Sequence, residues 1–135
     1  MSKNILVVDD HLTSRKIFKK YLMKSGIPVD SIFLAENGVE ALEIAGKVDI
    51  GLFLTDWRMP KMDGLNFIIN LKKINKYVKS PIIVITSQDD DVNKIMKDLS
   101  KGSYSVEYLR KPIEIDLFQD KIDKYLGDLK WAKYW

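Results

Sequence analysis

The sequence predicts one α/β domain in which a doubly wound, five-stranded parallel sheet carries helices on both faces. Strand-like and helix-like segments alternate about five times along the chain, which is typical of a parallel sheet with crossover helices. Three of the strand-like segments are almost entirely apolar, as central strands buried on both faces should be. The length of 135 residues suits a single domain with a proper core.

The first half of the chain predicts three strands and two helices. Apolar runs mark the strands, and apolar residues three and four apart mark the helices. Gly26 is expected to end the first helix, because glycine readily adopts the backbone conformation that stops one, and Asn37 can cap the second. In chain order, the elements are a strand at 5–9, a helix at 12–25 with Ile17, Phe18, Tyr21 and Leu22 as its apolar positions, a weaker strand at 31–35, a helix at 38–45 and a strand at 50–55.

The second half predicts two strands and three helices. A Pro-Lys-Met-Asp-Gly turn at 60–64 follows the third strand, and the acids at 89–91 stand where the start of a helix dipole favours negative charge. Asp116, with Gln119 three residues later, is expected to cap the last helix. In chain order, the elements are a helix at 65–77 with Leu65, Ile68 and Leu71 on one face, a strand at 81–86, a helix with Val92, Ile95, Met96 and Leu99, a strand at 106–110 and a helix with Phe118, Ile122, Tyr125 and Leu126.

Composition excludes several kinds of function. The chain has no cysteine, which rules out disulfides, zinc–thiolate sites and thiol catalysis. No apolar run approaches the roughly 20 residues of a membrane helix, and the apolar run at the N-terminus is too short for a signal peptide, so a cytoplasmic protein is expected. The net charge of +3 is mild and the lysines are spread along the chain, which argues against nucleic acid as a partner.

Three acids come at the ends of two predicted strands. Asp9 and Asp10 end the first strand, and Asp56 ends the third. In an open parallel sheet the binding crevice lies outside the carboxyl ends of the strands, where the strand order reverses. Carboxylates that converge there raise each other's pKa unless a cation lies between them. Magnesium is held by one or two carboxylates together with waters and a phosphate. The three acids therefore suggest a Mg²⁺ site that awaits a phosphoryl group.

Two further polar residues fall on the same edge. Thr86 ends the fourth strand and Lys111 ends the fifth. A hydroxyl donor and a fixed cation are what phosphoryl oxygens need opposite a metal. Each residue alone has an ordinary explanation as a helix cap, a turn residue or a solvated charge. An acid pair, an acid, a hydroxyl and a lysine that each end a different strand are harder to explain that way.

Taken together, these motifs make the sequence similar to the receiver domain of response regulators in two-component signalling. The resemblance covers about residues 3 to 126, and only the combination of motifs is specific. It implies a flavodoxin-like sheet with strand order 2-1-3-4-5, which is known for a chemotaxis member of the family and is carried over from it. The matching motifs are VVDD (Asp9, Asp10), ENGVEAL (Glu36 to Leu42), LTDWRMPKMDG (Asp56 to Gly64), VITS (Thr86) and YLRKP (Tyr108 to Pro112).

The resemblance implies a role for each acid. Asp56 would accept a phosphoryl group from the phosphohistidine of a sensor histidine kinase or a histidine phosphotransfer protein. Asp10 and Asp56 would ligate Mg²⁺ directly, together with the backbone carbonyl of Arg58, and Asp9 would act mainly through water. The domain would be a signalling phosphoacceptor, not an enzyme, since it would catalyse only its own phosphoryl transfer and dephosphorylation.

The resemblance also implies a switch. Lys111 would pair with the phosphoryl oxygens, Thr86 would swing toward them, and Tyr108 would turn inward to fill the space. This movement would alter the face formed by the fourth helix, the fifth strand and the fifth helix, where a downstream protein would bind. Trp57 would lie beside the nucleophile, partly over the pocket.

The sequence departs from the family pattern in a few places. Ser87 stands where alanine or glycine is usual, and Arg58 and Gln88 occupy positions that tune the lifetime of the phosphoryl group. The segment between Gly102 and Tyr108 is about two residues longer than usual. His11 is interpreted as a polar residue at the mouth of the site and not as a metal ligand, because oxygen ligands already suit Mg²⁺.

The domain organisation is expected to be a receiver at 1–127 and an aromatic tail at 128–135. The tail either continues the last helix and packs on the domain or marks an interaction site. Because no output domain follows residue 135, a stand-alone receiver is expected, although a receiver excised from a longer chain fits too. It is expected to be a monomer or weak dimer that does not bind a membrane. A chemotaxis-type role leads, with a phosphorelay shuttle as an alternative.

Three functions from other classes fit the residues less well. A haloacid dehalogenase-type phosphatase needs two acids, two residues apart, after the first strand. In this chain His11 occupies the position of the second acid. A flavin carrier of the same topology needs a glycine-rich phosphate loop there, which DDHLTSR lacks. The third is a receiver-shaped interaction module that has lost phosphorylation, and the presence of all five site residues argues against it.

Overall fold

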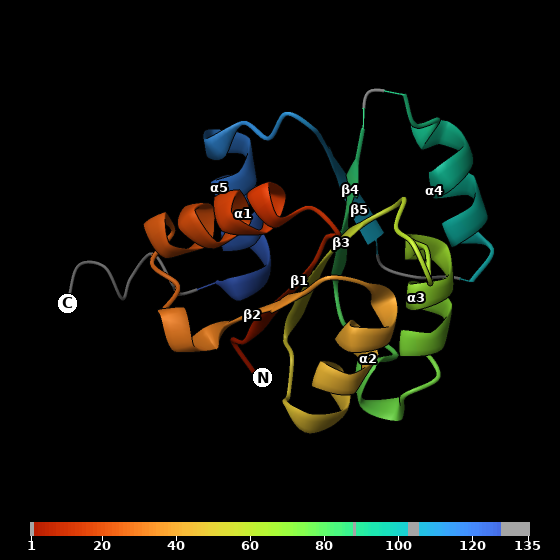
Figure 1. The fold of residues 1–135 in the computed structure, drawn as a ribbon, viewed down its shortest axis with the longest axis horizontal. Coiled ribbons are helices and arrows are strands. Elements are labelled where there is room, and N and C mark those ends of the chain that lie inside the picture. The colour runs from red at the N-terminus through yellow and green to blue at the C-terminus, as the bar shows by residue number, and fades with distance from the viewer. Residues whose placement is uncertain (1, 88, 103–105, 128–135) are drawn as a thin grey trace.

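Five parallel strands form one sheet in the order β2-β1-β3-β4-β5 (Figure 1). The computed structural model describes residues 2–87, 89–102 and 106–127. Within these residues the fold class predicted from the sequence is confirmed, and so is the strand order that the family resemblance implied. The strands are β1 (Ile5–Val8), β2 (Ile32–Ala35), β3 (Leu52–Asp56), β4 (Ile82–Thr86) and β5 (Val106–Arg110).

Helices cover both faces of the sheet. Figure 1 shows α1 and α5 together on one face and α2, α3 and α4 on the other. Two short 3-10 helices, Val29–Ser31 and Asn75–Tyr77, lie in the connections that lead into β2 and β4. The α-helices are α1 (Leu12–Lys24), α2 (Gly38–Lys47), α3 (Gly64–Leu71), α4 (Val92–Ser100) and α5 (Ile115–Leu126).

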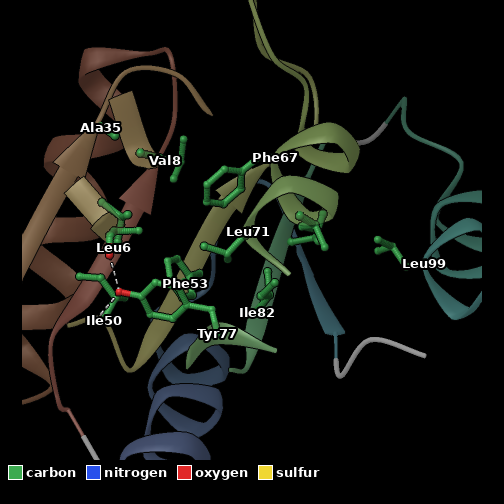
Figure 2. Packing of buried hydrophobic residues seen from close by; sticks show 14 of the residues in the cluster. Leu6, Val8, Ala35, Ile50, Phe53, Phe67, Leu71, Tyr77, Ile82 and Leu99 are labelled. Atoms are coloured by element: carbon green, nitrogen blue, oxygen red, sulfur yellow. Dashed lines mark hydrogen bonds between the residues drawn. The ribbon is translucent and has the colours of Figure 1, made fainter. Parts of the chain in front are cut away.

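Alternation along the strands divides the core into two halves. Because successive side chains of a strand point to opposite faces, neighbours in one strand serve different clusters. Leu6 and Phe53 pack with Phe67 and Tyr77 beneath α2, α3 and α4, as Figure 2 shows for Phe53, Phe67 and Tyr77. The intervening residues of β1 and β3 pack beneath α1 and α5 with aromatic residues of those helices: Ile5, Val7, Leu52 and Leu54 lie against Phe18 and Phe118. Both faces of the central strands are therefore buried.

Tyr77 and Lys72 lie at the amino edge of the sheet, by which we mean the side where the strands begin, opposite the carboxyl edge where they end. The buried Tyr77 hydroxyl lies 2.6 Å from the carbonyl oxygen of Ala45 and accepts the Ile50 N–H at 3.3 Å (Figure 2). Lys72 Nζ donates to the carbonyl oxygens of Tyr77 at 3.0 Å and Ser80 at 2.6 Å. Burial lowers the pKa of Lys72 to about 8. These contacts tie the end of α2, the start of β3 and the approach to β4 together.

The predicted helix 65–77 is too long. The structure ends α3 at Leu71 and adds a separate 3-10 turn, Asn75–Tyr77. In one continuous helix, Tyr77 would point well away from the buried face that carries Ile68 and Leu71. The break turns Tyr77 into the core, where its hydroxyl finds its partners.

The structure confirms two predictions about the helices and corrects two others. Gly26 follows α1 with a φ of 91°, and Asn37 caps α2 by accepting the Glu40 N–H at 2.9 Å. The last helix instead begins after Glu114, whose side chain makes no capping hydrogen bond, so Asp116 lies inside the first turn. Ile17, predicted on the buried stripe of α1, is 42% exposed, and Arg15 is buried near that stripe.

Among the described residues, no helix combines the length and apolar character needed to cross a membrane.

Candidate functional site

The carboxyl ends of β1 and β3 bring three aspartates together. These strands are neighbours with Val8 opposite Thr55, so the residues that follow Val8 lie beside Asp56. A ligand atom from each of Asp9, Asp10, Asp56 and His11 lies within 4.8 Å of the others. The convergence expected from the strand ends is therefore present.

Burial makes this convergence electrostatically unfavourable. Asp9 is 1% exposed and Asp56 is 7% exposed. Burial, followed by the negative charge of Asp9, raises the pKa of Asp56 to about 6, while Lys111 and the Trp57 N–H oppose the rise. Asp56 is thus ionised at neutral pH, in a position where a cation would relieve the repulsion.

Lys111 supplies one positive charge to this cluster. Its Nζ lies 3.0 Å from Asp9 Oδ2, 3.6 Å from Asp56 Oδ2 and 3.4 Å from Ser14 Oγ. The Lys111 N–H donates to the Thr86 carbonyl at 2.7 Å, which fixes the lysine to the end of β4. The Lys111–Pro112 peptide bond is cis. The Lys111 ammonium group therefore lies close to two of the three carboxylates, those of Asp9 and Asp56.

The donor set fits a hard divalent cation. Asp10 Oδ1 is buried and accepts no hydrogen bond from the described residues. The carboxylate oxygens around it are the ligands that Mg²⁺ prefers. His11 is exposed, and its Nδ1 lies 3.3 Å from Asp10 Oδ1 and 3.4 Å from Asp9 Oδ1, so it can pair with either acid when protonated. Asp10 Oδ1 is thus buried, accepts no hydrogen bond from the described residues and lies beside an exposed imidazole, which supports a cation at this position.

The loop after Asp56 folds back over the end of β3. The Gly64 N–H donates to the Trp57 carbonyl at 2.7 Å, and Asp63 caps α3 by accepting the Asn66 N–H at 2.8 Å. A Cβ at Gly64 would lie 2.8 Å from the Asp56 carbonyl oxygen, so the close approach requires glycine. Trp57 is half-buried and packs against the cluster beneath α2, α3 and α4. Its backbone N–H donates to Asp56 Oδ1 at 2.9 Å.

Thr86 and Tyr108, the two residues expected to form a switch, differ in exposure. Thr86 is fully buried and its hydroxyl donates to the Leu109 carbonyl at 3.4 Å. Tyr108 is 41% exposed, and its Cα pairs with Val84, two residues before Thr86. In this structure the tyrosine side chain thus faces outward.

Sequence reasoning missed two residues around the site. Arg15 is buried and donates to the Asp9 carbonyl at 2.7 Å. Asp90, which the sequence marks only as an acid at a helix start, is buried, and its Oδ1 lies 2.6 Å from Arg58 Nε. Nothing local distinguishes it from the acids on either side. Of the predicted tuning residues, Ser87 and Arg58 flank the site, while Gln88 lies outside the described residues, as do 103–105 of the long segment and the tail 128–135.

Comparisons with known proteins agree with this geometry. The model of the response regulator receiver domain family matches residues 5–123. A chemotaxis protein CheY homolog of Campylobacter jejuni is 34% identical over 124 residues, covering 91% of this chain and 92% of that protein. Sporulation initiation phosphotransferase F of Bacillus subtilis is 31% identical over 126 residues, covering 93% and 95%.

A solved structure shows the same fold. The crystal structure of a response regulator receiver domain protein from Clostridium thermocellum superposes with a TM-score of 0.77 at 27% sequence identity, covering 96% of this chain and 98% of that one. The family match, the relatives and the sheet edge with its three aspartates all point the same way. This chain therefore belongs to the response regulator receiver domain family of two-component signalling and is similar to its CheY-like chemotaxis members.

Proposed function

We propose that this chain is a receiver that is phosphorylated on Asp56 and signals through a phosphorylation-dependent protein-binding face. The observation that carries the proposal is the Asp56 carboxylate itself. It is buried at the end of β3 and lies 3.6 Å from Lys111, with Asp9 and Asp10 beside it. This is a carboxylate nucleophile next to groups that can neutralise a phosphoryl group.

Asp10 and Asp56, with the backbone carbonyl of Arg58, would hold Mg²⁺, and Asp9 would act mainly through water. The cation supplies charge neutralisation between the carboxylates and the phosphoryl oxygens. An Asp56 oxygen attacks the phosphorus of a phosphohistidine, the phosphorus–nitrogen bond breaks, and the histidine leaves with the bonding electron pair. The product is an aspartyl phosphate. Lys111 lies near both Asp9 and Asp56, so its ammonium group can pair with the phosphoryl oxygens once they are attached to Asp56.

Thr86 and Tyr108 would report the modification. The Thr86 hydroxyl makes a long hydrogen bond of 3.4 Å to Leu109, which is weak enough to be exchanged for a phosphoryl oxygen. Tyr108 lines a groove along β5 and α5 together with Met96, Leu117 and Lys121. An inward turn of Tyr108 would change that groove, which is our candidate for the face that binds a downstream protein.

The upstream partner would be a sensor histidine kinase or a histidine phosphotransfer protein. For the output, the 34% identity to a chemotaxis protein favours a chemotaxis-type role. The 31% identity to a sporulation phosphotransferase supports a phosphorelay shuttle as the second candidate. The two differ in whether phosphorylated Asp56 returns its phosphoryl group to a histidine.

The test is intact mass after incubation with acetyl phosphate, with and without Mg²⁺. We expect one phosphoryl adduct on the wild type, none without Mg²⁺, and none on Asp56→Ala. Asp63→Ala is the matched control, because Asp63 is an exposed acid of the same loop that caps α3. A folded wild type that takes no adduct, or an Asp56→Ala variant that takes one, would contradict the proposal.

A further inference from the structure

An ion pair joins the two loops that flank Asp56. Arg58 follows Asp56 by two residues in the β3–α3 loop, and Asp90 follows Thr86 by four residues in the β4–α4 loop. Arg58 Nε lies 2.6 Å from Asp90 Oδ1. The two side chains differ in environment: that of Arg58 is 67% exposed, while that of Asp90 is 3% exposed. A buried carboxylate is thus neutralised by an arginine that reaches it from the solvent side.

Asp90 also closes its own loop. Its Oδ2 accepts the Ser87 N–H at 2.8 Å, and its N–H donates to the Ser87 carbonyl at 3.2 Å. Arg110 donates to the same carbonyl at 3.2 Å. Ser87 directly follows Thr86, so the Asp90 carboxylate fixes the chain that leaves the end of β4. Oδ2 is therefore hydrogen-bonded to the loop, while Oδ1, which accepts no hydrogen bond from the described residues, has the positive charge of Arg58 beside it.

The ion pair with Asp90 also holds the Arg58 guanidinium away from Asp56. Among the described residues, Arg58 has its ion pair with Asp90 and none with Asp56. Lys111 occupies the side of Asp56 toward Asp9. A guanidinium two residues from a nucleophile would otherwise be free to bind it, since carboxylates are strong acceptors for arginine. Asp90 thus holds a second cation near Asp56 without letting it neutralise the nucleophile.

We propose that Asp90 is a positioning residue that holds Arg58 away from Asp56 until phosphorylation, and that the phosphoryl group then draws Arg58 across and releases the β4–α4 loop. This inference rests on the proposed phosphorylation of Asp56. A phosphoryl group carries more negative charge than the Asp90 carboxylate and offers three acceptor oxygens to the guanidinium fork. Asp90, once left without its counter-ion, is a buried charge that the fold cannot keep buried at low cost. The loop must then rearrange, next to Thr86 and at the start of α4.

The transfer has a consequence for the lifetime of the phosphoryl group. Hydrolysis requires a water molecule on the open side of the phosphorus, and an arginine bonded to the phosphoryl oxygens obstructs that approach. In wild type, Asp90 competes for the arginine. In Asp90→Asn the competitor has lost its charge, although the Ser87 N–H still finds an acceptor. The arginine should therefore stay on the phosphoryl group, and hydrolysis should slow.

The experiment measures the phosphoryl half-life by intact mass after removal of acetyl phosphate. It compares wild type, Asp90→Asn, Arg58→Gln, the double variant and Asp91→Asn. Asp91 is the matched control, because it is the adjacent acid and only caps α4 through the Lys94 N–H. We expect Asp90→Asn to lengthen the half-life about threefold or more, because the arginine then bonds the phosphoryl oxygens for a larger share of the time. In the Arg58→Gln background the same change should have no effect.

Three outcomes overturn the inference while the proposed function stands. These are a half-life in Asp90→Asn that is unchanged or shorter, an equal lengthening in Asp91→Asn, and a lengthening that persists without Arg58. A general loosening of the loop would give the last pattern, so dependence on Arg58 separates positioning from a structural effect. Absence of an adduct on every folded variant refutes the proposed function, and the transfer of Arg58 with it.

Discussion

The two edges of the sheet are built on opposite principles. At the amino edge, the buried hydroxyl of Tyr77 and the half-buried ammonium group of Lys72 meet carbonyl and N–H partners. At the carboxyl edge, three aspartates converge, Lys111 Nζ lies near two of them, Asp9 and Asp56, and the buried Asp10 Oδ1 accepts no hydrogen bond from the described residues. Buried polar groups stabilise a fold only when they are satisfied. The amino edge therefore contributes to the stability of the fold, while the carboxyl edge holds a charge conflict that a bound cation would relieve.

Truncation of Tyr77 should have the largest effect of all. Tyr77→Ala removes a buried ring that packs at 5.1 Å from the Phe53 ring and a hydroxyl that serves α2 and β3. We expect a loss of about 4 kcal/mol in the free energy of unfolding, measured in urea. Tyr108→Ala is the matched control, since Tyr108 is exposed, and it should cost about 0.5 kcal/mol. Similar losses in both variants would remove the contrast between the edges.

Gly64→Ala should disturb the carboxyl edge through the backbone. The new Cβ would lie 2.8 Å from the Asp56 carbonyl oxygen, and a backbone atom cannot move aside cheaply. We expect a loss of about 2 kcal/mol and slower phosphorylation by acetyl phosphate, because the loop over Asp56 must shift. Gly46→Ala is the control: its Cβ meets nothing within 4 Å in α2, and alanine favours helices, so a gain of about 0.5 kcal/mol is expected. A fully stable Gly64→Ala would refute the tight loop.

Asp56→Asn should stabilise the protein at neutral pH. Burial and Asp9 raise the pKa of Asp56 to about 6 from an ordinary 3.8, so the folded state binds the proton more tightly than the unfolded state. The wild type therefore loses stability as the pH rises from 3.8 through 6, and Asn avoids that loss. We expect a gain of about 1–2 kcal/mol at pH 7, after allowance for solvent screening, and almost none at about pH 4.

The amino edge offers the control for this pH dependence. Asp49 is exposed and Lys76 lowers its pKa, by a hydrogen bond and by its charge. Its contribution has the opposite sign: the stabilisation is present at neutral pH and fades as the pH falls. Asp49→Asn should therefore give no gain at neutral pH. An Asp56→Asn variant no more stable than Asp49→Asn would contradict the charge conflict at the carboxyl edge.

The sequence predicted the carboxyl edge better than it predicted the amino edge. Parallel strands place their carboxyl ends on one edge, so local pattern was enough to predict that the polar residues at these ends share that edge. Five residues end a strand or directly follow one: Asp9, Asp10, Asp56, Thr86 and Lys111. The predicted helix 65–77 wrongly includes Tyr77, because no glycine or proline marks the break after Leu71. The hydroxyl partners that require the break are Ala45 of α2 and Ile50 in the connection from α2 to β3, both far away in sequence.

The pairing of Arg58 with Asp90 shows the same limit. Both residues lie in loops, where side-chain direction follows from tertiary packing and not from periodicity. Three consecutive acids precede α4, and only the fold shows that Asp90 turns inward while Asp91 caps the helix. Contacts between loops are thus the part of this site that residue pattern does not encode.

The free energy of unfolding in urea, with and without Mg²⁺ at matched ionic strength, tests whether the carboxyl edge is assembled around a cation. The comparison needs wild type and Asp10→Asn. Mg²⁺ at about five times its dissociation constant should stabilise the wild type by about 1 kcal/mol. Asp10→Asn, which removes the negative charge of a carboxylate whose buried Oδ1 accepts no hydrogen bond from the described residues, should lose most of this gain. Equal stability of the wild type with and without Mg²⁺, or an equal gain in Asp10→Asn, would contradict a cation site built on these aspartates.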